Sequence, residues 1–133
     1  MFRIFSWRWS QLAVLGVGAA LVASCALLDS RPPEEIVRDR AQQRWDALLK
    51  GDIQGGYAFL SPGSRAVMTL DGYRTTIRPG FWKAAKVGDA KCGSAESCEV
   101  QAEIEYVVRG SRVKTPLGET WIRQQGNWWY VLK

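Results

Sequence analysis

The chain has 133 residues, which is enough for one domain and too few for two. Its 18 Lys and Arg residues and 13 Asp and Glu residues alternate, instead of forming the basic stripe of a nucleic-acid-binding protein. Histidine is absent, which excludes a histidine base and weakens the case for zinc. We therefore expect no cofactor, no metal and no nucleic-acid partner.

The N-terminal segment combines a basic start with a short apolar run. Arg3 and Arg8 precede residues 12–23, in which every residue is apolar or glycine. This run is shorter than the roughly 20 residues that a membrane-spanning helix needs. The pattern is typical of a secretory signal peptide. Its last residues, Val22-Ala23-Ser24-Cys25, resemble the lipobox of bacterial lipoproteins.

That resemblance implies a signal peptide over residues 1–24, which signal peptidase II removes, and a lipidated Cys25. Two or three acyl chains hold a protein stably on a leaflet, so we expect a membrane anchor. Residue 26 is Ala and not Asp. By the sorting pattern of enterobacterial lipoproteins, this implies the outer membrane, facing the periplasm. The alternatives are an ordinary signal peptide, or an uncleaved anchor with a chance cysteine.

Two cysteines are left for the folded part. Cys92 and Cys98 form an even pair in an oxidising compartment, and the five residues between them exclude a CxxC redox motif. We expect a disulfide that closes a hairpin turn and contributes about 2 kcal/mol. Residues 25–33 hold the lipidated cysteine and a linker, whose last eight residues reach at most about 25 Å. The folded domain, residues 34–133, is therefore expected close to the membrane.

Helical patterns come first in this domain. On a helix over residues 34–50, apolar side chains recur with helical spacing, and Gly51 ends the helix. Asp52 is expected to cap a second helix over residues 53–60. Shorter helical turns follow over residues 65–68 and 71–77. The apolar stripe of the first helix consists of Val37, Ala41, Trp45 and Leu48.

After Gly80 the apolar period changes to two. Even positions in residues 98–108 are apolar and odd positions are mostly charged, which predicts a strand buried on one face. We expect its neighbours over residues 81–91, 115–124 and 127–133, with bulges at Gly110 and Gly118. The fold class is therefore α+β, with N-terminal helices packed on a curved four-stranded antiparallel sheet.

Two parts of the chain resemble a known superfamily. The run Ala41-x-x-Arg44-Trp45-x-Ala47-Leu48-x-x-Gly51-Asp52 is similar to the opening of nuclear-transport-factor-2-like (NTF2-like; cone-fold, SnoaL-like) domains. Residues 118–123 and 126–130 resemble their last two strands, in particular those of small envelope lipoproteins. The resemblance implies a cone-shaped sheet around an apolar pocket. Its members include isomerases, dehydratases, carrier-like binders and pocketless scaffolds, so the fold does not name a function.

The sequence offers little catalytic chemistry inside such a cone. The dehydratases of this superfamily use a His–Asp pair, which this chain lacks. Tyr106 falls on the buried face of its strand, where we interpret it as a core aromatic. Glu119 shares a face with Leu117 and Trp121, so it is the candidate acid. We expect it at the rim, paired with an arginine.

Aromatic residues supply the remaining candidates. Trp128 and Trp129 are neighbours on a strand, so they point to opposite faces. One can be buried, while the other faces solvent, another chain or the lipid surface. Arg65, Tyr73 and Arg74 are expected at a pocket mouth. The candidate pocket or contact residues are Tyr57, Arg65, Tyr73, Tyr106, Glu119, Trp121, Trp128 and Trp129.

These patterns predict a lipid-anchored, non-enzymatic protein of the cell envelope that binds a partner protein or a small apolar ligand. The alternative is a cone-fold enzyme of the isomerase or hydrolase type with a tyrosine and carboxylate site. A third hypothesis is a structural accessory subunit. A deep cavity with a carboxylate beside a tyrosine would favour the enzyme, and a cone filled by side chains would argue against it.

Overall fold

The computed structural model describes residues 29–133, so the predicted signal peptide and the lipidation site at Cys25 lie outside the described residues. Within them, four helices precede four strands. No helix of this part is long and apolar enough to cross a membrane. The elements are α1 (Pro33–Leu49), α2 (Ile53–Tyr57), α3 (Pro62–Val67), α4 (Leu70–Ile77), β1 (Trp82–Ser94), β2 (Ser97–Val108), β3 (Ser111–Gln124) and β4 (Asn127–Val131).

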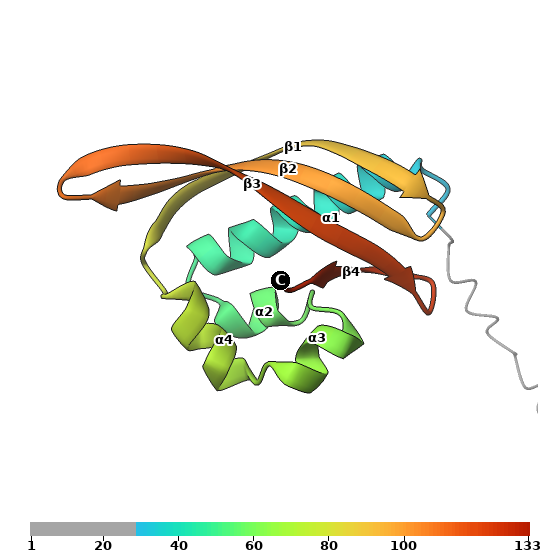
Figure 1. Ribbon diagram of the computed structural model, residues 1–133, viewed down its shortest axis with the longest axis horizontal. Helices are drawn as coiled ribbons and strands as arrows, with labels where there is room; N and C mark the ends of the chain where they lie inside the picture. Colours follow the sequence, from blue (N-terminus) through green and yellow to red (C-terminus); the bar gives the residue numbers. More distant parts are fainter. Residues whose placement is uncertain (1–28) are drawn as a thin grey trace, which may run out of the picture.

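The predicted α+β class, helices followed by a four-stranded antiparallel sheet, is confirmed. Figure 1 shows the sheet arching over α1, with α2, α3 and α4 below. Helix α1 begins with a proline and two glutamates in its first turn, which suit the positive end of the helix. It ends before Gly51, whose φ of 81° favours glycine.

Side-chain caps fix the three short helices. The side chains of Asp52, Ser61 and Thr69 accept from the backbone N–H three residues on. Helix α2 ends at Tyr57, so its expected extension to residue 60 is wrong. The reason is that the next residues pair with β4: Tyr130 N donates to Phe59 O at 2.8 Å, and Ser61 N donates to Tyr130 O at 2.8 Å.

The sheet has the order β1-β2-β3-β4, and all neighbours are antiparallel. Its irregularities all lie in β1, where the register shifts at three places. The bulges expected at Gly110 and Gly118 are wrong. Gly110 lies in the β2–β3 turn, and Gly118 pairs with Gln101 in unbroken register. Strand β1 packs along α1, so the curvature is needed there.

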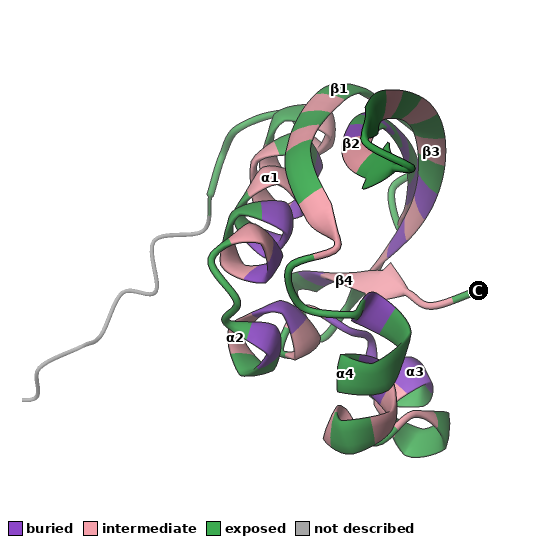
Figure 2. Ribbon diagram, turned by 90° about the vertical axis from the view of Figure 1, so that its left-hand side faces the viewer, coloured by how far each residue is buried: buried purple, intermediate pink, exposed green. Residues whose placement is uncertain are grey.

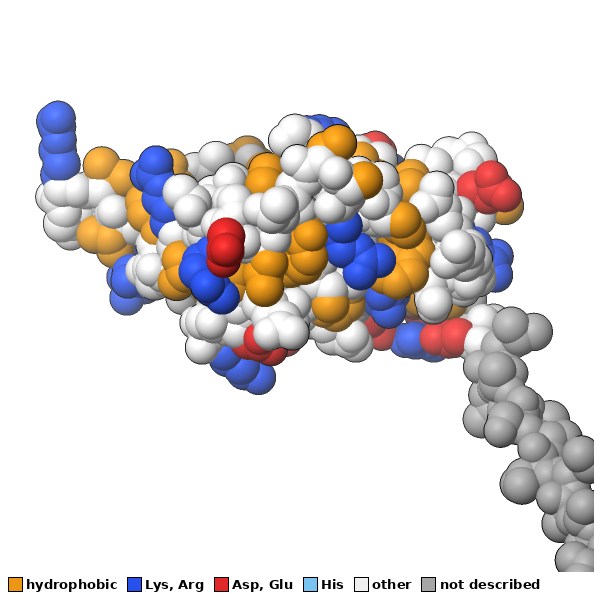
Figure 3. All heavy atoms as spheres, turned by 90° about the horizontal axis from the view of Figure 1, so that it is seen from below, with side chains coloured by type: hydrophobic (Ala, Val, Ile, Leu, Met, Phe, Trp, Pro, Cys, Tyr) orange, Lys and Arg blue, Asp and Glu red, His pale blue; other side chains and the backbone are white. Residues whose placement is uncertain are grey.

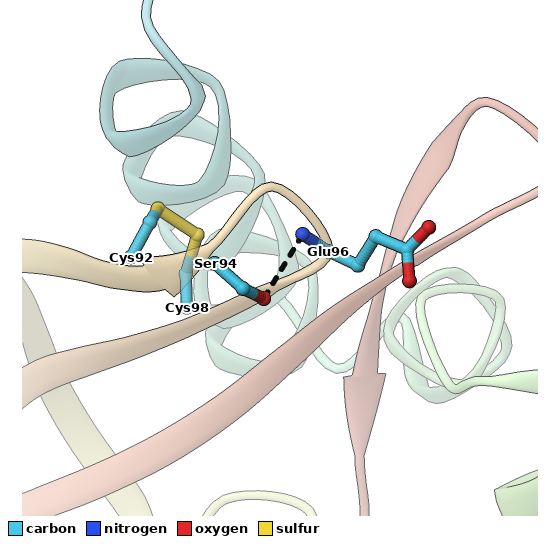
Figure 4. The surroundings of a disulfide bond; sticks show 4 residues. All are labelled: Cys92, Ser94, Glu96 and Cys98. Atoms are coloured by element: carbon cyan, nitrogen blue, oxygen red, sulfur yellow. Dashed lines mark hydrogen bonds between the residues drawn. A yellow bond between two sulfur atoms is a disulfide. The ribbon is translucent and has the colours of Figure 1, made fainter.

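The predicted Cys92–Cys98 disulfide is present and joins the end of β1 to the start of β2. Figure 4 shows it beside the turn, where Glu96 N donates to Ser94 Oγ at 3.2 Å. The same turn is tied to β3, because Arg123 N donates to Glu96 O at 2.8 Å. The disulfide therefore closes a turn that three strands share.

The apolar core lies between the sheet and the helices, and α1 contributes to both of its clusters. Figure 2 shows the buried residues on the inward sides of α1, β2, β3 and β4. One cluster contains Trp45, Leu48, Ile53, Leu60, Tyr73, Ile77 and Ile104. The other contains Val37, Ala41, Cys98, Val100, Trp121 and Trp128.

The core ends before the tip of the β2–β3 hairpin. Tyr106, expected to be buried, is only half-buried, and Val108 is 44% exposed. In Figure 1 this hairpin extends beyond the helices, so its far end has nothing to pack against. The alternation of β2 therefore predicts burial correctly only as far as Ile104.

Candidate functional site

A buried ionic cluster occupies the centre of the domain. Arg44 on α1 and Glu119 on β3 form an ion pair, with Arg44 Nη1 at 2.9 Å from Glu119 Oε1. Their side chains are 2% and 0% exposed. The rim position expected for Glu119 is wrong, although its partner is an arginine. Glu119 can be buried because N–H donors in the core reach both oxygens of its carboxylate.

Two indole groups complete the surroundings of this carboxylate. Trp45 Nε1 donates to Glu119 Oε1 at 2.7 Å, and Trp121 Nε1 donates to Glu119 Oε2 at 3.0 Å. With the arginine, three N–H donors converge on one carboxylate. A charged group that is removed from water needs such partners, because an unpaired buried charge is strongly unfavourable.

Two tyrosines surround the arginine. Arg44 Nη2 donates to the hydroxyl oxygen of Tyr73 at 3.1 Å, and its guanidinium lies 3.9 Å from the ring centroid of Tyr130. Burial raises the pKa of both tyrosine hydroxyls, so both groups stay neutral near pH 7. Burial also opposes the charge of Arg44, but Tyr73 and Glu119 favour it more, so its pKa lies above the ordinary value.

This arrangement joins a tyrosine, an arginine and a carboxylate, yet their polar groups are turned toward one another. Each oxygen of Glu119 already accepts from the protein. The side chains of Trp45 and Trp121 close the space around it and are themselves almost fully buried. The cluster is therefore built to hold α1, α4 and β3 together, and its acid is not placed to meet a substrate.

The other predicted tyrosines do not join the cluster. Tyr57 donates its hydroxyl to Met68 O at 2.7 Å and thereby ties α2 to the end of α3. Tyr106 stacks on Phe81 with ring centroids 5.2 Å apart, and its hydroxyl lies 3.2 Å from Thr115 Oγ1. Both tyrosines thus have local structural partners.

Outside the core, the chain forms a groove of about 520 Å³ between the start of α1 and the β3–β4 turn. Arg31 holds one wall through ion pairs with Asp29 and Asp39. The lining also includes Arg40 and Arg123, neither of which has an ion pair among residues 29–133. The groove therefore combines a neutralised wall with two unpaired cations.

The two neighbouring tryptophans of β4 do separate to opposite faces. Trp128 is 4% exposed and belongs to the core, whereas Trp129 is half-buried. The guanidinium of Arg40 lies 5.9 Å from the Trp129 ring centroid, and that of Arg65 lies 5.3 Å from it. Arg40 also lies 5.0 Å from the Phe59 centroid. We call Arg40, Phe59, Arg65 and Trp129 the arginine–tryptophan patch.

The structure thus divides the predicted site residues into three groups. Tyr73, Glu119 and Trp121 meet in the buried cluster. Arg65 and Trp129 meet in the patch, and the buried Trp128 is the neighbour of Trp129 on β4. Tyr57 and Tyr106 belong to neither group. Sequence reasoning missed Arg44 and Arg40. The signal for Arg44 was its place on the buried stripe, three residues after Ala41 and four before Leu48.

No protein-family model matches this chain, and no curated protein matches it significantly. Solved structures share its fold. A SEC-C motif containing protein from Psychrobacter arcticus superposes with a TM-score of 0.62 at 9% identity, over 77% of this chain and 62% of that one. This chain thus spans less than two thirds of that protein.

Two further structures are similar. A SEC-C motif containing protein from Rhodopseudomonas palustris gives a TM-score of 0.57 at 15% identity, over 75% of each chain. An NTF2-like transpeptidase from Campylobacter jejuni gives 0.53 at 13% identity, over 73% of this chain and 98% of that one. At these identities the likeness concerns the fold alone, and the third structure agrees with the NTF2-like architecture.

Proposed function

We propose that this protein is a lipid-anchored, non-enzymatic binding domain of the bacterial cell envelope, on the periplasmic face of the outer membrane. The observation that carries the proposal is the occupied interior of the cone. Arg44 and Glu119 fill its centre, where they form an ion pair, and Trp45 and Trp121 pack around them. A partner must therefore bind to the outer surface, which favours another protein over a small apolar ligand.

An enzyme with a tyrosine and carboxylate site is the less favoured function. Such a site needs an acid that can reach a bound substrate, and Glu119 has its three donors supplied by the protein. The Campylobacter jejuni structure is named a transpeptidase, but the described domain of this chain offers no free thiol as a nucleophile. Cys92 and Cys98 are joined to each other there.

The anchor is proposed from the lipobox-like run that ends at Cys25. The Cys92–Cys98 disulfide supports an exported protein, because disulfides persist in oxidising compartments such as the periplasm. The anchor also explains the odd third cysteine, which acylation would consume.

Metabolic labelling with palmitate tests the anchor directly. Wild-type protein is expected to incorporate the label, and Cys25→Ala to lose it. The matched control is the double variant Cys92→Ser/Cys98→Ser, which removes two cysteines and should still be labelled. Equal labelling of wild type and Cys25→Ala would end the lipoprotein proposal.

The filled interior is tested with an apolar fluorescent probe, such as anilinonaphthalene sulfonate, titrated into the folded protein. We expect no stoichiometric binding under native conditions, because Trp45 and Trp121 occupy the space that a ligand would need. The control is Trp121→Ala, which should open a cavity and raise probe binding. Stoichiometric binding by the wild type would contradict the filled cone and revive the ligand-binding and enzymatic alternatives.

A further inference from the structure

Two arginines of the arginine–tryptophan patch are partly removed from water without a carboxylate to balance them. Arg40 and Arg65 are half-buried, and neither forms an ion pair within residues 29–133. Burial lowers the pKa of Arg40, which reflects the unfavourable loss of water around its charge. Other arginines without an ion pair, such as Arg38 and Arg109, are exposed and solvated.

The guanidinium of Arg40 is held in a defined orientation. Its Nε donates to Trp128 O at 2.9 Å, and aromatic rings of Phe59 and Trp129 lie 5.0 and 5.9 Å from its central carbon. The hydrogen bonds of the described residues do not involve its two terminal nitrogens. A planar fork with both terminal nitrogens free can donate two parallel hydrogen bonds, which suits the oxygens of a phosphate group.

Arg40 brings the patch to the end of the domain from which the chain continues toward Cys25. Arg40 and Trp128 line the same groove as Asp29, the first described residue. Only four residues of sequence lead from Cys25 to Asp29, a reach of at most about 14 Å. An acyl anchor on Cys25 would therefore hold this end of the domain at the membrane surface.

The chemistry of the patch matches that surface. Tryptophan prefers the headgroup layer of a bilayer, where its ring is amphipathic like its surroundings. Arginines near an anionic leaflet are attracted to its phosphates. Figure 3, viewed from the side of α2, α3 and α4, shows Lys and Arg side chains beside apolar ones on this face, together with a few acidic side chains.

We propose that the arginine–tryptophan patch binds the phosphate headgroups of anionic phospholipids in the leaflet that holds the anchor. The patch thereby gives the domain one fixed orientation on the membrane. This inference rests on the proposed lipid anchor for its geometry. The short tether favours lipid over an acidic protein segment as the occupant, because it would keep Arg40, which lines the same groove as Asp29, near the bilayer.

Vesicle sedimentation tests this binding without the anchor. The chain is made from residue 25 onward with Cys25→Ser, which keeps both core clusters whole, since their members lie between residues 36 and 132. We expect it to sediment with phosphatidylcholine vesicles in which about a third of the lipid is phosphatidylglycerol, and not with pure phosphatidylcholine, at about 0.15 M salt.

The variant Arg40→Gln/Arg65→Gln should weaken binding about 30-fold, because each arginine near an anionic surface contributes about fivefold. The matched control is Lys86→Gln/Arg109→Gln, which removes the same charge from exposed positions without ion pairs on β1 and the β2–β3 turn. It should bind like the parent chain. Thermal melts followed by circular dichroism establish that both variants are folded.

Three results would overturn the proposal. One is equal binding to both kinds of vesicle, or to neither. Another is an equal loss of binding in the control variant, which would mean that net charge alone accounts for vesicle binding. The third is a parent chain that ignores vesicles but binds polyglutamate through Arg40 and Arg65, which would assign the patch to an acidic protein. The palmitate experiment reports on the anchor separately, so failure of one proposal is distinguishable from failure of the other.

Discussion

Replacing Glu119 with glutamine removes one charge from the buried cluster and leaves its shape nearly unchanged. The arginine then stays buried without a counter-charge, and the new amide nitrogen must stand in for one oxygen. If it replaces Oε2, it faces Trp121 Nε1, which is also a donor. Breaking a buried ion pair by removing one partner destabilises a protein by about 3–5 kcal/mol. We expect Glu119→Gln to lose about 4 kcal/mol of unfolding free energy.

That loss is a large fraction of the roughly 5–15 kcal/mol that keeps a domain of this size folded. Urea denaturation, followed by tryptophan fluorescence and circular dichroism, measures it. The matched control is Glu103→Gln, whose carboxylate forms an exposed ion pair with Lys114 at 3.1 Å. Exposed pairs contribute less than about 1 kcal/mol, so this control should unfold almost like wild type.

The double variant Arg44→Met/Glu119→Gln separates charge from packing. It removes the unbalanced charge together with its partner, so we expect it to be more stable than Glu119→Gln alone by at least about 1 kcal/mol. Two results would refute the reasoning: a loss below about 1 kcal/mol for Glu119→Gln, or a double variant that is no more stable than Glu119→Gln alone.

Three further predictions concern the rest of the domain. Cys92→Ser/Cys98→Ser should lower stability by about 2 kcal/mol and the thermal midpoint by about 10 °C; an unchanged midpoint would mean that the pair is not bonded in solution. Burial raises the pKa of Tyr73 and Tyr130, so their contribution to stability is fully present below about pH 10 and is lost as pH rises further. In urea titrations at increasing pH, Tyr73→Phe should reduce this alkaline loss of stability. Gly56→Ala should destabilise the fold by about 1–3 kcal/mol, because a Cβ would lie 2.3 Å from Leu48 Cδ2. In the control Gly63→Ala, the new Cβ would have nothing within 4 Å, so the urea midpoint should be unchanged or slightly raised.

The order of the elements could be predicted from local patterns, because each pattern lies within a short stretch of the sequence. The apolar stripe from Val37 to Leu48 and the alternation along β2 each indicate which face of one element is buried. The cap residues indicate where a helix begins. They located α1, β2 and the disulfide to within a few residues. They placed the bulges wrongly, because the curvature of β1 depends on its packing against α1 and not on a glycine.

The centre of the site could not be predicted in the same way. Arg44 and Glu119 are 75 residues apart, and although each shares a face with apolar residues, neither position indicates its partner. Only the packing of α1 under the sheet brings them together and makes their burial favourable. Arg40 is one of several charged residues in the sequence of α1, and nothing local indicates that Phe59 and Trp129 flank its guanidinium.

The irregular edge strand β1 bears on how copies of this protein would meet if the proposed anchor holds them on a membrane. Acyl anchors would confine many copies to two dimensions, where open sheet edges meet often. A long flat edge would template strand pairing between neighbouring copies. In β1 the register breaks at three places, and Lys83, Lys86 and Lys91 stand exposed along it. We expect these features to keep neighbouring molecules from joining edge to edge.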